Sequence, residues 1–355
     1  MPQITLPGRV VGDAHPAYLI ADIAANHDGD LARAIALIHR AAEAGADAAK
    51  FQHFRAEQIV SGPGFAALGS QLAHQSSWKR SVVEVYRTAS VPRDWTPILA
   101  DECRKAGIDF FSAPYDPASA DHLDPFVPAY KIGSGDLTWH AHLRHVAAKG
   151  KPVLLATGAS TLAEVEAAVE CIRRVNPSLL LMQCNTNYTA SLDNFHHVNL
   201  RVLSTYRARF PDLPLGLSDH TPGHATALGS IALGACAIEK HFTDNTGRDG
   251  PDHRFSMDPA AWREMTLRVR ELEHALGDGV KRIEANERET SVVQRRAAYA
   301  TRALPADTPV RASDFEMLRP APAGSLNPHQ FELAEGRKLK AGLDVGACLM
   351  ESSLE

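Results

Sequence analysis

The sequence predicts a (β/α)8 TIM barrel followed by a small β-rich domain, and three observations carry this prediction. About eight short apolar runs alternate with helix-patterned segments between residues 18 and 276. Nearly every run ends in a polar residue, and after residue 295 the pattern changes to short β-like runs between Pro and Gly turns. Barrels of this class carry their reactive side chains at the carboxyl ends of the strands. We therefore expect a barrel domain at residues 1–280, a linker at 281–296 and a small domain at 297–355.

The expected strands are short segments that end in polar clusters. They are Tyr18–Asp22, Ala48–Gln52, Ile108–Ala113, Ala129–Gly133, Pro152–Ala156, Leu179–Gln183, Leu215–Leu217 and Ala235–Ile238. The helices between them carry recognisable ends. Asp30 is placed to cap a helix that starts at Leu31, and Gly45 to end it.

The connection from residue 53 to 95 is irregular and long, and it allows two interpretations. Long insertions at this place often shape the mouth of a barrel's active site. Equally, the segment could be a solvated excursion that holds one helix near Val82–Tyr86.

Composition and charge limit which partners and which cellular location can be expected. The formal net charge is −5, so no nucleic-acid footprint is expected. No apolar run approaches 20 residues, which predicts no transmembrane helix, and the first residues lack the apolar segment of a secretory signal. The five cysteines are scattered and odd in number, which favours a reducing, cytoplasmic location.

His220 and His241 are the candidate metal ligands. They follow neighbouring strands of the expected sheet, so both rings should lie at the same edge. Two imidazoles can hold one divalent cation and leave positions open for substrate. Glu239 shares the face of His241 and could support it or act as a third ligand. Asp219 should point away from His220 and form a cap or a structural ion pair.

Lys50 and Lys131 lie within barrel strands, where a cation is costly unless it meets an anion. Near the hydroxyl groups of Ser134, Thr157 and Ser218, they suggest a phosphate or carboxylate substrate. Internal salt bridges with Asp22, Asp136 or Glu239 are the compatible structural interpretation. Asp22 and Asp136 could also act as general bases. Ser112 is a further polar strand end and a candidate substrate contact.

Several segments, in this order, resemble the sialic acid synthases (N-acetylneuraminate synthase and its legionaminate and pseudaminate relatives). They are ANHDGD, KFQ, KIGSGD, TGAS, GLSDHT, IEKHFT and GPDH, and the later LRPAPAG and EGRKLKAG resemble that family's antifreeze-like domain. The resemblance implies condensation of phosphoenolpyruvate with an N-acylated aldose, giving a nine-carbon 2-keto-3-deoxy acid and phosphate. It also implies Mn²⁺ or Mg²⁺ on His220 and His241, and a domain-swapped homodimer whose antifreeze-like domain covers the partner's barrel mouth.

By motif, the resemblance assigns residues to each substrate. Lys50, Lys131, Ser134 and Ser218 match phosphoenolpyruvate-binding positions. Gln52, Tyr188 and Asp252 match sugar-binding positions, and Arg319 matches an arginine that reaches the acyl group across the dimer. Asp136 matches the acid that handles the attacking water, and Asp22 matches another active-site acid.

The chain also departs from the family pattern. Asp22 and Asp136 stand where many members have Glu, Ala156 replaces a Ser, and Thr186 falls where Asn is usual. These changes leave the identity of the sugar open.

Two other functions are compatible with the residues. Lys131 could be the nucleophile of a metal-free Schiff-base aldolase. The chain could also be a non-catalytic sugar-binding protein.

Overall fold

The computed structural model describes residues 1–70, 75–76 and 78–355. The chain divides into two compact units, Met1–Gly277 and Asp278–Glu355, and each is described by itself.

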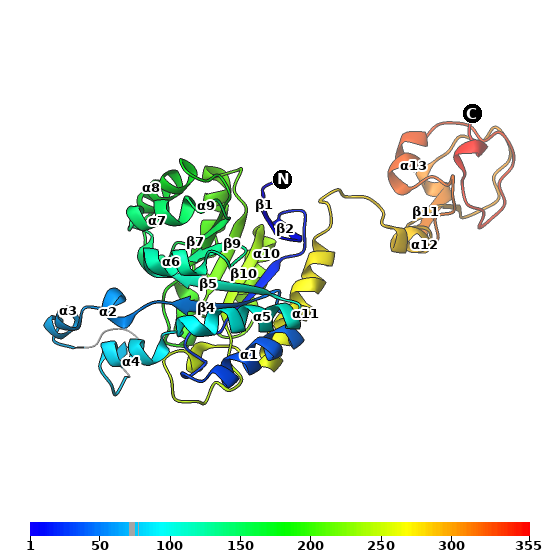
Figure 1. The fold of residues 1–355 in the computed structure, drawn as a ribbon. Coiled ribbons are helices and arrows are strands. Elements are labelled where there is room, and N and C mark those ends of the chain that lie inside the picture. Colours follow the sequence, from blue (N-terminus) through cyan, green and yellow to red (C-terminus); the bar gives the residue numbers. More distant parts are fainter. Residues whose placement is uncertain (71–74, 77) are drawn as a thin grey trace. The chain divides into compact units, whose positions relative to one another are not determined.

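Eight parallel strands form the sheet of the first unit, in the order β5-β4-β3-β10-β9-β8-β7-β6. β5 and β6, which end this order, also pack side by side, so the sheet curls into a barrel. The predicted barrel is thereby confirmed (Figure 1). The strands are β3 (Tyr18–Asp22), β4 (Ala48–His53), β5 (Asp109–Pro114), β6 (Tyr130–Ile132), β7 (Val153–Ala156), β8 (Leu179–Cys184), β9 (Leu215–Asp219) and β10 (Ala235–His241).

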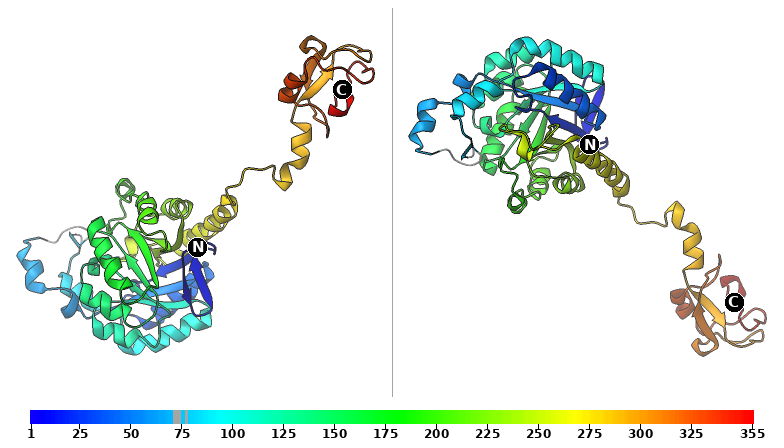
Figure 2. Two further views of the ribbon diagram at one scale, coloured as in Figure 1. Left: turned by 90° about the horizontal axis from the view of Figure 1, so that it is seen from above. Right: turned by 90° about the horizontal axis from the view of Figure 1, so that it is seen from below.

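Helices surround these strands, as the three views in Figures 1 and 2 show. Asp30 accepts hydrogen bonds from the backbone of Ala32 and Arg33 and so caps the first of them, as predicted. Gly45 follows that helix with φ +93°, a conformation that glycine adopts without strain. The main helices are α1 (Leu31–Glu43), α5 (Thr96–Ala106), α6 (Pro117–Leu123), α7 (His140–Ala147), α8 (Leu162–Arg173), α9 (Val202–Arg209), α10 (Ala225–Ala232) and α11 (Pro259–Leu276).

Two apolar layers hold the barrel together. The outer layer lies between the strands and the helices, and the inner layer fills the barrel. Ile4, Leu6 and Val11 join the inner layer from a hairpin of β1 (Gln3–Leu6) and β2 (Arg9–Gly12). This hairpin was not predicted, because its strands are only four residues long and meet at a turn that contains Gly8.

The connection after β4 carries α2 (Ala56–Ile59), α3 (Gly62–Ala67) and α4 (Val82–Ala89). The predicted helix near Val82 is confirmed, and a capping box at Ser81 and Glu84 starts it. Residues 71–74 and 77 of this connection lie outside the described residues.

The second unit has its own apolar core, which includes Phe315, Phe331 and Leu349. β11 (Ala297–Ala300) and β12 (Phe315–Leu318) pair antiparallel, and α13 (Pro328–Ala334) packs on them. Single β-bridges join the remaining segments. The charged stretch before β11 is the predicted linker. It is helical at Ala285–Glu287, a 3-10 turn, and in α12 (Arg288–Val293).

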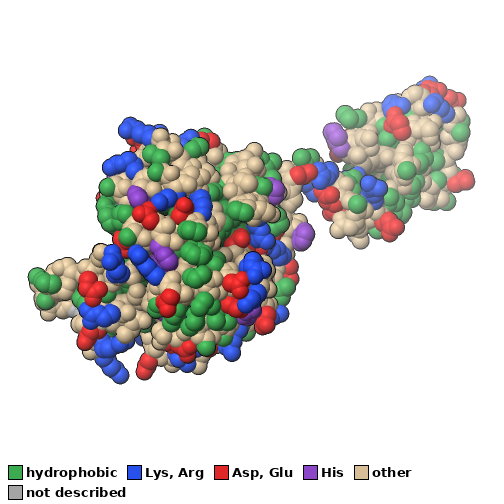
Figure 3. Space-filling model, viewed as in Figure 1, with side chains coloured by type: hydrophobic (Ala, Val, Ile, Leu, Met, Phe, Trp, Pro, Cys, Tyr) green, Lys and Arg blue, Asp and Glu red, His purple; other side chains and the backbone are tan. Residues whose placement is uncertain are grey.

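Within the described part of the chain, no helix is both long enough and apolar enough to cross a bilayer. On the face drawn in Figure 3, acidic and basic side chains of the barrel unit are interspersed.

Candidate active site

Several of the predicted site residues gather on the inward face at the carboxyl ends of the strands. Parallel pairing sets Asp22 beside both Lys50 and His241, and Ser218 beside Glu239. Because side chains alternate along a strand, these residues share the inner face at adjacent levels.

Two lysines and two carboxylates form a buried charge network at this level. Lys50 Nζ lies 2.6 Å from Oδ2 of Asp22 and 3.6 Å from Oε1 of Glu239. Lys131 Nζ lies 3.2 Å from the same oxygen of Glu239, to which Ser218 also donates a hydrogen bond of 3.2 Å. Burial opposes ionisation, but the charges of Lys131 and Lys50 lower the pKa of Glu239 to about 2. The expected internal salt bridges are therefore present.

The opposite face of the same strands carries a second ion pair. Asp219 and Lys240 are paired there, and both are nearly fully buried. Thr221 and Thr226 donate hydrogen bonds of 2.8 and 2.6 Å to Oδ2 of Asp219. The predicted structural role of Asp219 is confirmed. This ion pair joins β9 to β10. Its two members directly precede His220 and His241 in the sequence.

His220 and His241 lie side by side, with ring centroids 5.3 Å apart. Nδ1 of His220 is 2.8 Å from the carbonyl of Asn185, which can only accept, so Nδ1 carries the proton and Nε2 offers a lone pair. Burial lowers the pKa of both histidines to about 3, so both rings are neutral. Phe255 packs against the two rings at centroid distances of 6.1 and 4.8 Å.

These residues fit a divalent cation. Neutral imidazoles are the metal-binding form of histidine. Nδ1 of His241 is buried and has no hydrogen-bond partner among the described residues, and the same holds for Oε2 of Glu239. Buried polar atoms normally have a partner, so these two are suited to hold an ion or a substrate. The described residues contain no cluster of three or more His, Cys, Asp or Glu with metal-binding geometry. The ion would therefore rest on two protein ligands and keep positions for water and substrate.

A cavity of about 120 Å³ opens beside His241. Gln52, Tyr188 and Asp252, the three residues predicted to bind the sugar, all line it. Tyr188 stacks edge-on against His220 at 4.3 Å between centroids. The residues predicted to bind the sugar and those predicted to hold the metal therefore lie together.

Ser134 and Gly158 form a small polar corner of the site. The Gly158 amide donates a hydrogen bond of 2.8 Å to Oγ of Ser134. A Cβ at Gly158 would meet Cγ2 of Thr186 at 2.7 Å and Sγ of Cys184 at 3.1 Å, so only glycine fits. Thr186 thus lies against Gly158, beside Ser134.

Asp136 lies in a 3-10 turn (Ser134–Asp136) directly after β6. Burial raises the pKa of its carboxyl to about 6. Burial likewise raises the pKa of Asp252 to about 7.

Ser112 and Thr157 do not join the cluster, contrary to the prediction. Ser112 pairs with Phe51 on the outward face, where its hydroxyl lies 2.7 Å from Nδ1 of His53. Ala113 takes the inward position beside Gln52. Thr157 donates to the carbonyl of Met182 and accepts from Tyr206 of α9, again outside the barrel. Arg319 belongs to the second unit.

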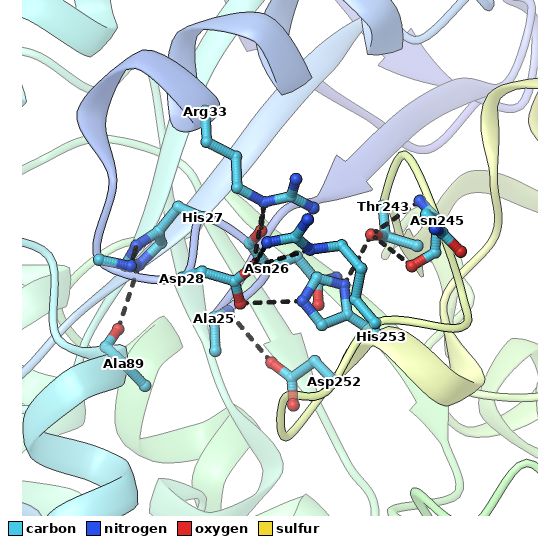
Figure 4. Close-up of polar contacts among 12 residues, drawn as sticks. Ala25, Asn26, His27, Asp28, Arg33, Ala89, Thr243, Asn245, Asp252 and His253 are labelled. Carbon is cyan, nitrogen blue, oxygen red and sulfur yellow. Dashed lines mark hydrogen bonds and ion pairs between the residues drawn. The ribbon is translucent and has the colours of Figure 1, made fainter.

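A polar clamp holds the loop that carries Asp252 (Figure 4). Buried His253 bridges Asp28 at 2.9 Å and Thr243 at 2.7 Å. Arg248 adds two hydrogen bonds to Asp28, of 3.0 and 2.8 Å. Asp252 itself accepts a hydrogen bond of 3.1 Å from the Ala25 amide. The segment after β3 and the segment after β10 are therefore locked together at the cavity wall.

Sequence reasoning missed this clamp and the aromatic walls of the site. Phe255, Phe54, Tyr86 and Tyr115 come from segments far apart along the chain, and no local pattern marks them. Asp28 and His253 did lie in two polar clusters, NHDGD and GPDH, which are the signal that could have linked them.

The barrel, with paired neutral imidazoles and buried lysines at its carboxyl rim, defines the chain as a (β/α)8-barrel enzyme. The chain belongs to the NeuB family, which matches residues 37–281.

Similar proteins cover almost the whole chain. An N,N'-diacetyllegionaminic acid synthase of Legionella pneumophila is 32% identical, over 97% of this chain and 96% of that protein. An N-acetylneuraminate-9-phosphate synthase of Mus musculus is 31% identical, over 98% and 96%. The crystal structure of an N-acetylneuraminic acid (sialic acid) synthetase of Leptospira borgpetersenii superposes with a TM-score of 0.71 at 28% identity, covering 81% of this chain and 94% of that one.

Proposed function

We propose that this enzyme condenses phosphoenolpyruvate with an N-acylated hexosamine-type aldose, giving a nonulosonic acid and phosphate. One observation carries the proposal: two buried lysines adjoin two neutral histidines at one rim of the barrel. Lysines suit a small trianion, and the histidines suit the cation that an aldehyde acceptor needs. The relatives named for legionaminic and N-acetylneuraminic acid products support the same class of reaction.

Lys50 and Lys131 neutralise the carboxylate and phosphate of phosphoenolpyruvate in this scheme. Ser134 and Ser218 offer hydroxyl donors beside them. Glu239 holds the two ammonium groups together before substrate binds. An incoming anion must compete with its carboxylate for them, which lowers the affinity for the anion.

His220 and His241 would hold Mn²⁺ or Mg²⁺. When bound, such an ion supplies Lewis acidity to the aldehyde oxygen. Asn185 fixes the His220 ring in the tautomer that ligation requires.

Carbon 3 of phosphoenolpyruvate attacks the aldehyde carbon, and the aldehyde oxygen takes a proton from solvent. Water adds to carbon 2 and gives one proton to Asp136, which leaves a hydroxyl on carbon 2. The bond between carbon 2 and the bridging oxygen then breaks, phosphate leaves with that oxygen and takes up the hydroxyl proton, and the product keeps a 2-keto group. Asp22, which is paired with Lys50, would hold the ammonium group of Lys50 in position.

The second unit and the assembly are also part of the proposal. By resemblance, Asp278–Glu355 contains an antifreeze-like domain that covers the barrel mouth of a partner in a domain-swapped homodimer. Arg319 would then meet the acyl group of the aldose. A cytoplasmic location is proposed because all five cysteines are free thiols.

The test is phosphate release from phosphoenolpyruvate against a panel of N-acyl hexosamines, with and without Mn²⁺. Phosphoenolpyruvate labelled with ¹⁸O at the bridging position should give labelled phosphate. Label retained in the organic product would contradict C–O cleavage. No release with any aldose would favour a non-catalytic sugar-binding protein.

The Schiff-base aldolase needs Lys131 as a free nucleophile. Its Nζ is instead engaged with the carboxylate of Glu239 at 3.2 Å. Borohydride in the presence of pyruvate should therefore leave the chain unmodified.

A further inference from the structure

The loop that follows β8 carries two groups that touch the candidate metal ligand His220. The carbonyl of Asn185 accepts the hydrogen bond of 2.8 Å from Nδ1 of His220. Tyr188, in the same loop, packs edge-on against the His220 ring. The backbone of residues 185–187 nevertheless makes no backbone-to-backbone hydrogen bond with any described residue. The Asn185 carbonyl is therefore held in place by contacts other than a strand ladder.

Two side-chain amides close this loop on itself. Gln183 donates a hydrogen bond of 2.9 Å from Nε2 to the carbonyl of Val198. Asn185 donates a hydrogen bond of 3.2 Å from Nδ2 to the carbonyl of His197. The two donors come from the end of β8, and the two acceptors are adjacent in the chain at the far end of the loop. We call these four residues the amide clasp.

Burial makes the clasp specific for this closed arrangement. Gln183 is 7% exposed and Val198 is 3% exposed. Water cannot readily replace the donor of a carbonyl at such a position, so loss of the amide leaves that carbonyl unpaired at a cost in free energy. Asn185 then connects the clasp to the site, because its side chain holds the loop end while its own carbonyl holds His220.

We infer that Gln183 and Asn185 are positioning residues for His220, since their side-chain amides fix the loop whose carbonyl sets the tautomer of the His220 ring. The inference rests on the proposed function in taking His220 as a metal ligand. A ring that keeps its proton on Nδ1 offers the lone pair of Nε2 to a cation. Groups that orient a metal-binding histidine in this way are worth about 10- to 100-fold in metal affinity.

The test removes each amide in turn. Gln183→Leu keeps the approximate size of the buried side chain, and Asn185→Ala is a small change at a half-buried position that keeps the test valid if leucine at 183 prevents folding. Asn176→Leu is the matched control. Asn176 is 6% exposed and donates a hydrogen bond of 2.7 Å to the carbonyl of Lys151. It precedes β8, at the end of the barrel opposite to the two histidines.

Two measurements report on His220 without using activity. In calorimetric titration with Mn²⁺, Gln183→Leu and Asn185→Ala should bind about tenfold more weakly than the parent, and Asn176→Leu should bind as the parent does. In histidine-ring ¹H–¹⁵N spectra of the metal-free chain, the His220 signal is identified by its loss in His220→Ala. It should show the proton on Nδ1 in the parent and the control, and a mixture of tautomers in both clasp variants.

Each outcome decides a separate point. Unchanged Mn²⁺ affinity and an unchanged tautomer in both clasp variants would overturn the inference and leave the proposed reaction standing. An equal loss of affinity in Asn176→Leu would also overturn it, because a general loosening of the barrel would then explain the effect. If the parent binds no Mn²⁺, the proposed metal site is wrong, and the tautomer measurement still decides whether the clasp positions His220.

Discussion

The ammonium of Lys131 lies 3.2 Å from Oε1 of Glu239, the same oxygen that faces Lys50 at 3.6 Å. One buried carboxylate thus separates two buried cations. The arrangement has two consequences: Glu239 stabilises the folded barrel, and it competes with any anion that approaches the two lysines.

Glu239→Gln should destabilise the barrel by about 3 kcal/mol, because two buried ammonium groups lose a counter-ion. Added phosphate should restore more stability to this variant than to the parent. Urea unfolding with and without phosphate measures both effects. Glu264→Gln, at an exposed pair on α11, is the matched control and should change little. Equal phosphate effects on parent and variant would contradict the account.

Asp219→Asn should cost about 3–5 kcal/mol of stability, because Lys240 is then left buried and unpaired. The pair lies on the face turned away from the substrate, so the KM of any remaining activity should change little. Urea unfolding and steady-state kinetics together separate the two effects. A raised KM with unchanged stability would show that the pair acts in the site.

The Asp136 carboxyl should make both the stability of the chain and its activity depend on pH. Its pKa rises from 3.8 to about 6 on folding because it is buried. The folded chain therefore holds this proton more tightly, so the group contributes stability below about pH 4 that is lost as the pH rises through 6. Phosphate release, which needs the carboxylate, should increase over the same range.

Asp136→Asn should abolish phosphate release and flatten that part of the stability profile between pH 4 and 7. Exposed Asp249→Asn should leave both as in the parent. An identical stability profile for parent and Asp136→Asn would show that this carboxyl titrates normally.

Asp28→Asn should loosen the loop that carries Asp252, since the amide keeps the shape but not the charge that holds His253 and Arg248. The KM for the aldose should rise by roughly tenfold, with a smaller change for phosphoenolpyruvate. Asp30→Asn is the matched control two residues away, because asparagine caps a helix as well as aspartate. Equal changes in both KM values would indicate a general loss of structure instead.

Much of the fold followed from strand-length apolar runs, caps and glycine stops, which are local signals. The alternation of side chains along a strand is also a local signal. It was sufficient to predict that Asp219 and His220 point in opposite directions. The prediction was wrong at Ser112 and Thr157 because the last inward position of each strand depends on register. In β5 and β7 that position belongs to Ala113 and Ala156.

Other features depend on tertiary contacts that no local pattern records. The β1–β2 hairpin contributes Ile4 and Val11 to the barrel interior from a segment without strong strand character. The aromatic wall of the cavity joins residues after two different strands to one insertion helix. These residues are not spaced with a helical or strand period, so the sequence alone could not have assigned them to one wall.

The most direct test of the account is titration of the chain with Mn²⁺, for the parent and for His220→Ala, His241→Ala and the exposed-histidine control His274→Ala. The account predicts a single ion bound by the parent and by His274→Ala. Each of the other variants should lose affinity by about 100-fold or more, together with phosphate release from phosphoenolpyruvate. Undiminished Mn²⁺ binding and full phosphate release in both His220→Ala and His241→Ala would contradict it.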